Sequence, residues 1–241
     1  MKLLMHTCCA PCSVYCIDEL RNSGIEPTLY WYNPNIHPYT EYVARRNCLK
    51  EYAKKVGVNA IFNDEYGLDE FCKNVASNLN ARCINYCYPV RLRKTFEYAK
   101  ENGYDTVTTT LLYSIYQKHD FIKLMEDLSK EFGIDFLYID FRKGFWQGHD
   151  KAIEQGLYMQ KYCGCIFSEE DRYFNRNISK PMLPNGYELP KKQRLEVKRI
   201  ENKNEYLDLL LEADPSKESI AKYLQESDVY GLKLENNIVS L

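Results

Sequence analysis

The residues in this sequence that are most able to do chemistry are cysteines in three short groups. They lie in the stretches HTCCAPCS, RCINYC and YCGC, and are Cys8, Cys9, Cys12, Cys83, Cys87, Cys163 and Cys165. Thiolates that are brought together repel one another unless a cation neutralises them, and both zinc and iron–sulfur clusters prefer thiolate ligands. The three groups therefore predict a metal site, provided that the fold brings them to one place.

The composition is that of a globular protein, and we expect its thiols to stay reduced. Of the 241 residues, 45% are hydrophobic and 27% are charged. No run approaches the roughly 18 apolar residues of a membrane span, and the N-terminus lacks the long apolar region of a secretory signal. We therefore expect a cytoplasmic protein with no membrane partner, in which clustered cysteines serve metal binding or redox chemistry rather than structural disulfides.

Strand-like and helix-like segments alternate along the first three quarters of the chain. The expected strands are at residues 2–7, 26–33, 59–64, 104–112 and 134–141. The expected helices are at residues 13–24, 39–57, 88–103, 119–133 and 151–159. Because the connections are too long for hairpins, this order predicts an α/β fold with a mainly parallel, doubly wound, Rossmann-like sheet and helices on both faces. Ligands of such sheets bind outside the carboxyl ends of the strands, where the first cysteine group lies.

The last part of the sequence differs in character from the rest. Residues 181–241 contain no cysteine and no histidine, and we expect a strand-like piece and two helices there. We therefore divide the chain into a metal-binding catalytic α/β domain over residues 1–180 and a small C-terminal extension of unknown role over residues 181–241.

The spacing of the cysteines favours an iron–sulfur cluster over a structural zinc site. Zinc needs two C-x(2–4)-C pairs, which CAPC and CINYC would supply, but Cys8, Cys163 and Cys165 would then be unused. Adjacent Cys8 and Cys9 point in different directions, which suits two irons of one cluster, or a cluster and a neighbouring ion. CAPC between a strand and a helix is also typical of a thioredoxin-type thiol/disulfide oxidoreductase, but the other cysteine groups would then be superfluous.

The YCGC stretch is suited either to electron transfer or to metal binding. Cysteines one residue apart can form only a small, strained disulfide ring, which Gly164 makes feasible, and a strained disulfide is easily reduced. We interpret Cys163 and Cys165 as a catalytic redox pair or as further metal ligands, and their spacing does not choose between the two roles.

Taken in order, these motifs resemble those of the cobalamin-independent epoxyqueuosine reductases, which carry out the last step of queuosine synthesis at the anticodon wobble position of tRNA. The resemblance spans roughly residues 3–170 and rests on HTCCAPCS, RCINYCYPVRLRKTFEYA, TTTLLYSIYQKH, FRKGFWQG and YCGCIFS. One departure from the family pattern is that three residues, instead of two, separate Cys83 from Cys87.

The resemblance implies a 4Fe–4S cluster, a second mononuclear metal ion (iron or zinc), and reduction of an epoxide on a cyclopentane ring to an alkene. For the metal sites it implies Cys8, Cys9, Cys83 and Cys87 as cluster ligands, with Cys12 as a ligand of the second ion. The implied partners are tRNA carrying epoxyqueuosine and an electron donor that is ferredoxin- or flavodoxin-like.

The loop after the strand expected at residues 104–112 is predicted to contact the substrate. Tyr116 and Gln117 follow the carboxyl end of this strand, where ligands bind, so we expect both to bind the substrate. Unstacked bases of an anticodon loop stack on aromatic side chains such as that of Tyr116. His119 is expected to deliver a proton, with helix capping as its alternative role. Arg45 and Arg91 belong to a set of basic residues that would meet tRNA phosphates, and we include Arg91 among the substrate-binding residues.

Two other classes of protein fit part of the pattern. An ATP-dependent tRNA sulfur-transfer enzyme also combines an α/β core with cysteines, and it would carry a zinc or iron–sulfur site. It requires a Gly- and Ser-rich phosphate loop after the first strand, whereas CCAPC lies there in this sequence. A metal-storage or carrier protein would not need the loops YSIYQKH and FRKGFWQG.

Overall fold

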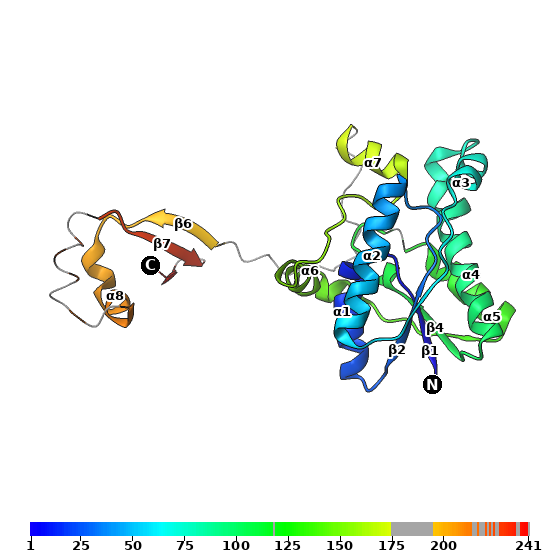
Figure 1. Cartoon of the computed structure of the whole chain (residues 1–241), viewed down its shortest axis with the longest axis horizontal. Helices are drawn as coiled ribbons and strands as arrows, with labels where there is room; N and C mark the ends of the chain where they lie inside the picture. The colour runs from blue at the N-terminus through cyan, green and yellow to red at the C-terminus, as the bar shows by residue number, and fades with distance from the viewer. Residues whose placement is uncertain are drawn as a thin grey trace. The chain divides into compact units, whose positions relative to one another are not determined.

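The structure is a computed structural model that describes residues 1–117, 119–174, 195–213, 216, 220, 222, 224, 227–234 and 237–240 (Figure 1). The chain divides into two units, Met1–Leu189 and Pro190–Leu241. All ten cysteines belong to the first unit. The division that we expected at residue 180 falls within residues 175–194, outside the described part of the chain.

A five-stranded sheet forms the centre of the first unit. Its strands are β1 (Leu3–His6), β2 (Pro27–Trp31), β3 (Ala60–Phe62), β4 (Thr106–Thr109) and β5 (Asp135–Phe136). The order across the sheet is β3-β2-β1-β4-β5, and all four pairings are parallel. The chain thus winds outward from β1 in both directions, which confirms the predicted doubly wound α/β fold. The point where the winding reverses lies between β1 and β4, at whose carboxyl ends such folds bind their ligands.

Helices cover both faces of this sheet, with α1 and α2 on one side and α4 and α5 on the other (Figure 1). The helices of the first unit are α1 (Ala10–Asn22), α2 (Tyr39–Val56), α3 (Leu68–Val75), α4 (Tyr88–Glu101), α5 (Phe121–Phe132), α6 (Phe145–Glu154) and α7 (Ile166–Tyr173). Helices α2 and α5 end at Gly57 and Gly133, as predicted, because both glycines adopt the left-handed conformation that closes a helix (φ 66° and 64°).

Three local expectations are wrong. The strand expected at residues 134–141 is reduced to Asp135–Phe136, because only these residues pair with β4. Helix α6 begins at Phe145 rather than at residue 151, with Gly148 inside it. Helix α3 was not expected, since its eight residues are too few for their apolar spacing to be recognised.

The second unit contains an antiparallel sheet. Strands β6 (Leu195–Arg199), β7 (Tyr230–Leu234) and β8 (Asn237–Ser240) lie in the order β6-β7-β8, and helix α8 covers Leu207–Ala213. We expected a single strand-like piece, because strands of four or five residues that pair with distant partners leave little signal in the sequence. Among the described residues of the whole chain, no helix has both the length and the apolar character needed to cross a membrane.

Two glycines allow α6 to pack closely against α1. A Cβ atom at Gly144 would lie 2.1 Å from ring atoms of Tyr15. A Cβ atom at Gly148 would lie 2.8 Å from the Tyr113 hydroxyl oxygen and from the Cβ of Tyr15. The same Tyr113 hydroxyl donates a hydrogen bond of 2.7 Å to the carbonyl of Phe145, the first residue of α6. These contacts hold the start of α6 beside the helix that carries Cys12.

We predict that Gly144→Ala lowers the free energy of unfolding by about 1–3 kcal/mol, because the added methyl group forces the Tyr15 ring out of its packed position. Gln147→Ala is the matched control, since Gln147 is exposed on the same helix, and it should change stability by less than about 0.5 kcal/mol. Urea denaturation followed by circular dichroism measures both values. Equal stabilities for the two variants would contradict the close approach of α6 to α1.

Two buried histidines lie at the ends of the central strands. His6 ends β1, and its Nδ1 atom is 2.9 Å from the Thr109 hydroxyl oxygen at the end of β4. His37 follows β2 and is 1% exposed. Burial lowers the pKa of His6 to about 3 and that of His37 to about 4. Both side chains are therefore neutral in the folded protein at pH 7.

This burial predicts that the protein loses stability as the pH falls from about 6.5 toward 4. The unfolded chain binds protons at both histidines below a pKa of about 6.5, whereas the folded chain does not, so stability is complete above that pH. Each neutral histidine accounts for a loss of about 2 kcal/mol between pH 7.5 and pH 5. In the His37→Leu variant, the loss of unfolding free energy between pH 7.5 and pH 5 should be smaller by the contribution of one histidine. Urea denaturation at the two pH values measures this loss. An unchanged loss in the variant would contradict the assignment.

Candidate metal and redox site

Three thiols follow the first strand at the carboxyl edge of the sheet. Cys8 and Cys9 lie between β1 and α1, and Cys12 lies in the first turn of α1 beside Pro11. Proline is tolerated there because the first turn of a helix has no partner for its N–H groups. The Sγ atoms of Cys8, Cys9 and Cys12 all lie within 4.8 Å of one another. We call these three residues the cysteine triad.

Hydrogen bonds within the triad make the three thiols unequal. Hydrogen bonds from Cys12 and Cys9 hold the pKa of Cys8 well below its usual range. Burial raises the pKa of Cys9, and the hydrogen bond to Cys8 raises that of Cys12. The triad therefore favours the thiolate at Cys8 and the thiol at Cys9 and Cys12, and a bound cation would favour the thiolate at all three sulfurs.

A second group of thiols forms where the middle and late motifs meet. Cys83 and Cys87 bound a π-helical turn that leads into α4, and Tyr88 donates its N–H to the carbonyl of Cys83 across this wide turn. The π-helical turn accommodates the extra residue of the middle motif and keeps the two thiols hydrogen-bonded to each other. Cys165, just before α7, hydrogen-bonds to Cys87 as well.

The thiols of the second group are unequal as well, with Cys87 as the one that keeps its proton most firmly. Hydrogen bonds from Cys87 lower the pKa of Cys165 and that of Cys83. The same two bonds, first the one to Cys165 and then the one to Cys83, raise the pKa of Cys87. The positive charge of Arg82 adds to the lowering at Cys165, to which its guanidinium group also hydrogen-bonds. Arg82 is held in turn by an ion pair with Asp171 of α7.

The side chains of Gln117 and Arg91 contact cysteines of the middle and late motifs. The Tyr88 hydroxyl donates a hydrogen bond of 2.9 Å to Oε1 of Gln117, and Nε2 of Gln117 donates one of 3.1 Å to Sγ of Cys163. Arg91 is 3% exposed and donates a hydrogen bond of 2.6 Å from Nε to the Cys87 carbonyl. Its charge acts on Cys87 and Cys163 and also on His6 below the triad.

The segment before α7 connects the late cysteine motif to the triad. Nε2 of Gln160 donates a hydrogen bond of 3.3 Å to Sγ of Cys12, and Cys163 lies three residues further along. The Oε1 atom of Gln160 is buried and has no hydrogen-bond partner among the described residues. The early and late cysteine motifs therefore meet at the same edge of the sheet.

The remaining predicted site residues differ in how closely they approach the thiols. Tyr116 precedes Gln117 and is 48% exposed, with its ring edge against Phe145. His119 is half-buried and packs against Phe121; burial lowers its pKa, and its Nε2 atom has no partner within the described part of the chain. The structure describes no hydrogen bond between His119 and a cysteine.

Two arginines from the set of basic residues expected at tRNA phosphates lie inside the protein. Arg45 is 1% exposed and Arg91 is 3% exposed, so any contact of Arg91 with a substrate would be made within the site. The sequence analysis missed the inward position of Arg45 and the roles of Arg82 and Gln160. Only Arg82, next to Cys83 in the middle motif, carried a signal that would have found it.

The donor set fits a metal ion or an iron–sulfur cluster. All the grouped ligand atoms are soft thiol sulfurs, which zinc and iron–sulfur clusters prefer. The guanidinium groups of Arg45, Arg82 and Arg91 offset the negative charge that several thiolates would bring. The buried Oε1 atom of Gln160 next to the triad marks a polar position that protein atoms leave unpaired in the described residues.

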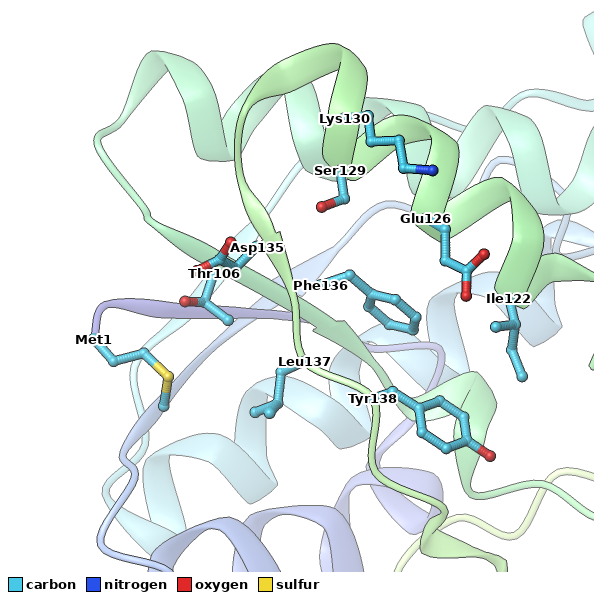
Figure 2. Close-up of a pocket in the computed structure, with 10 residues that line it drawn as sticks. All are labelled: Met1, Thr106, Ile122, Glu126, Ser129, Lys130, Asp135, Phe136, Leu137 and Tyr138. Carbon is cyan, nitrogen blue, oxygen red and sulfur yellow. The ribbon is translucent and has the colours of Figure 1, made fainter.

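A groove on another part of the first unit has none of these features. It has a volume of about 750 Å³ and runs along β5 and α5, where Figure 2 shows the Phe136 ring pointing toward the side that carries Glu126 and Ile122. No cysteine, histidine or arginine lines it. It contains no group of thiols, so the candidate site is the cysteine edge.

Comparisons with known proteins agree with this site. A family model described as epoxyqueuosine reductase QueH matches residues 3–171, which include all three cysteine motifs. The epoxyqueuosine reductase QueH of Dehalococcoides mccartyi is 37% identical over 177 residues, which cover 73% of this chain and 97% of that protein.

Two further relatives show the same relationship. The epoxyqueuosine reductase QueH of Histophilus somni is 34% identical over 185 residues, covering 70% of this chain and 73% of that protein. That of Haemophilus influenzae is 34% identical over 178 residues, covering 70% and 72%. This chain therefore belongs to the epoxyqueuosine reductase QueH family.

Proposed function

We propose that this protein is an epoxyqueuosine reductase that acts on tRNA carrying epoxyqueuosine and leaves queuosine at the anticodon wobble position. The main support is the meeting of three cysteine motifs at one sheet edge in a member of this family. The reaction consumes two electrons and two protons, converts the epoxide to an alkene and releases the oxygen as water. A reducing, cytoplasmic setting suits a site built on free thiols.

We propose that the site holds a 4Fe–4S cluster on Cys8, Cys9, Cys83 and Cys87, and a second ion, iron or zinc, on Cys12. When bound, the cluster supplies electrons one at a time, and the second ion acts as a Lewis acid toward oxygen. The distances within the triad and the hydrogen bond between Cys83 and Cys87 support this assignment. A ferredoxin- or flavodoxin-like protein is the proposed electron donor.

Cys163 and Cys165 are proposed as a redox pair. Oxidation of the two thiols to a disulfide releases two electrons and two protons, which is the amount that the reduction of one epoxide to an alkene and water consumes. The lowered pKa of Cys165, caused first by the hydrogen bond from Cys87, favours the thiolate that such exchange requires. The same closeness to Cys87 suits the alternative role of Cys165 as a further ligand.

The substrate is proposed to approach over Tyr116 and Gln117. The exposed ring of Tyr116 provides a face for an unstacked base of the anticodon loop, and Gln117 connects that position to Cys163. Arg91 is proposed to contact the substrate inside the site, where it also balances thiolate charge. His119 is proposed to hold a proton for the departing oxygen.

Anaerobic reconstitution with iron and sulfide, followed by dithionite as the source of the two electrons, should produce deoxygenation of epoxyqueuosine in an anticodon stem-loop RNA, because the electrons must pass through the thiol-bound metal site. Removal of the metal by chelation should abolish turnover, and renewed reconstitution should restore it. Product nucleosides separated after digestion of the RNA give the readout. Full activity of the metal-stripped protein would contradict the proposal.

Cysteine variants provide the control for this experiment. Cys12→Ser and Cys87→Ser should lower turnover by more than about 100-fold, since removal of a ligand typically costs that much or more. Cys72→Ser should retain full turnover, because Cys72 is exposed on α3 and takes no part in either thiol group.

His119→Ala should lower kcat by about 10²-fold while leaving the affinity for the RNA unchanged, because the loss of a positioned proton donor slows only the chemical step. His149→Ala, which removes a partly exposed imidazole on α6, is the matched control. Turnover of the His119 variant at the wild-type rate would exclude a proton-donor role for this residue.

A further inference from the structure

The segment of residues 158–165, here called the late segment, crosses the site without helix or strand structure of its own. It carries Gln160, which contacts Cys12, and Cys163, which contacts Gln117. A stretch of irregular backbone has no ladder of hydrogen bonds, so its carbonyl and N–H groups must find other partners if it is to stay in one place.

One side chain of α2 binds two carbonyl groups of this segment. Arg45 donates a hydrogen bond from Nη1 to the Cys163 carbonyl and another from Nη2 to the Tyr162 carbonyl, and both are 2.9 Å long. Its third donor, Nε, is 2.7 Å from Oε1 of Glu41, one turn earlier on α2. Glu41 also accepts a hydrogen bond from the Tyr158 hydroxyl. The ion pair therefore binds the late segment at its first residue, Tyr158, and again at Tyr162 and Cys163.

The ion pair is withdrawn from water, which makes its bonds stronger and its loss more costly. Arg45 is 1% exposed and Glu41 is 8% exposed. The Tyr162 ring stacks near the Arg45 guanidinium group, 5.4 Å from ring centre to Cζ. Arg45 also interacts with the charges of Cys9 and Cys8. The same cation thus faces the triad and the late segment.

The loop after β2 provides the neighbouring anchor points. The Tyr162 hydroxyl donates a hydrogen bond of 2.7 Å to the His37 carbonyl, and the His37 N–H donates one of 2.8 Å to the Gly164 carbonyl. A Cβ atom at Gly164 would lie 3.3 Å from Ile36 and 3.7 Å from Nη1 of Arg45. The late segment is therefore pressed closely against this loop and against Arg45.

We propose that the Glu41–Arg45 ion pair is a latch that holds the late segment over the cysteine triad, with Arg45 as a positioning residue. A buried ion pair adds little net stability, but it fixes one arrangement of the groups that it binds. Through the latch, Gln160 stays against Cys12 and Cys163 stays beside Gln117. The benefit to catalysis rests on the proposed function, whereas the closed position of the segment does not.

Thiol labelling of the metal-free, full-length protein tests the latch. N-Ethylmaleimide is added under native conditions, and mass spectrometry follows the modification of each cysteine. Cys12 and Cys165 are 6% and 3% exposed, so their labelling reports opening of the late segment. Cys16, in the core side of α1 and 0% exposed, reports unfolding of the whole unit, and exposed Cys72 corrects for reagent reactivity.

Two variants remove the latch in different ways. Arg45→Lys keeps the positive charge, but an ammonium group cannot bind two carbonyls and Glu41 in the planar arrangement of a guanidinium group. The double variant Glu41→Gln with Arg45→Met removes both charges and so leaves neither buried without its partner. Arg46→Met is the matched control, because the neighbouring Arg46 pairs with Asp64 and does not touch the late segment in the structure.

In both latch variants, Cys12 and Cys165 should label at least about tenfold faster than in the wild type, since each hydrogen bond from a charged donor is worth roughly that factor or more. Cys16 should remain protected, and Arg46→Met should label at wild-type rates. Labelling of Cys12 and Cys165 at the wild-type rate in both variants would overturn the latch, as would Cys16 accelerating in step with them.

The outcomes also separate the latch from the proposed function. If the double variant does not fold, Arg45→Lys and Tyr158→Phe decide the question by the same rates. Faster labelling in the variants together with a wild-type protein that cannot reduce epoxyqueuosine would leave the latch in place and refute only the function. An active wild-type protein whose latch variants label slowly would refute only the latch.

Discussion

The mutual repulsion of thiolates in a place with little water is the constraint on which this site depends. Within the triad only Cys8 favours the thiolate, and in the second group the hydrogen bonds from Cys87 favour the thiolate at Cys165 and at Cys83. The fold meets this constraint with buried arginines rather than with solvent. Arg45 faces the triad, and the charge of Arg91 acts on Cys87 and Cys163. A bound metal would complete the same balance of charge.

The parallel sheet explains how residues more than 150 positions apart reach one edge. Because β1 lies at the centre of the sheet, the loop that follows it lies beside the loops after β2 and β4. The loop after β2 binds the late segment through His37, and the loop after β4 contributes Gln117. The close packing of α6 against α1, made possible by Gly144 and Gly148, sets where the late segment begins.

Much of this arrangement is predictable from the sequence, because the motifs and the alternation of strands and helices are local signals. The α/β class and the position of the triad after β1 follow from them. The two-residue length of β5 does not, since aromatic and aliphatic residues recur along the whole of IDFLYIDF and only the pairing with β4 decides where the strand ends. The inward direction of Arg45 is also invisible, because adjacent Arg45 and Arg46 look alike until the packing of α2 buries one of them.

The central claim is that these thiols gather to hold iron and sulfide at the carboxyl edge of the sheet. Iron and acid-labile sulfide analysis of anaerobically purified protein, combined with its visible spectrum, tests this claim most directly. The account predicts about four sulfides and four irons per chain for one 4Fe–4S cluster, or about five irons where the second ion is also iron, with a broad charge-transfer absorption. Protein that contains zinc without sulfide, or that binds neither iron nor sulfide after reconstitution, would contradict it.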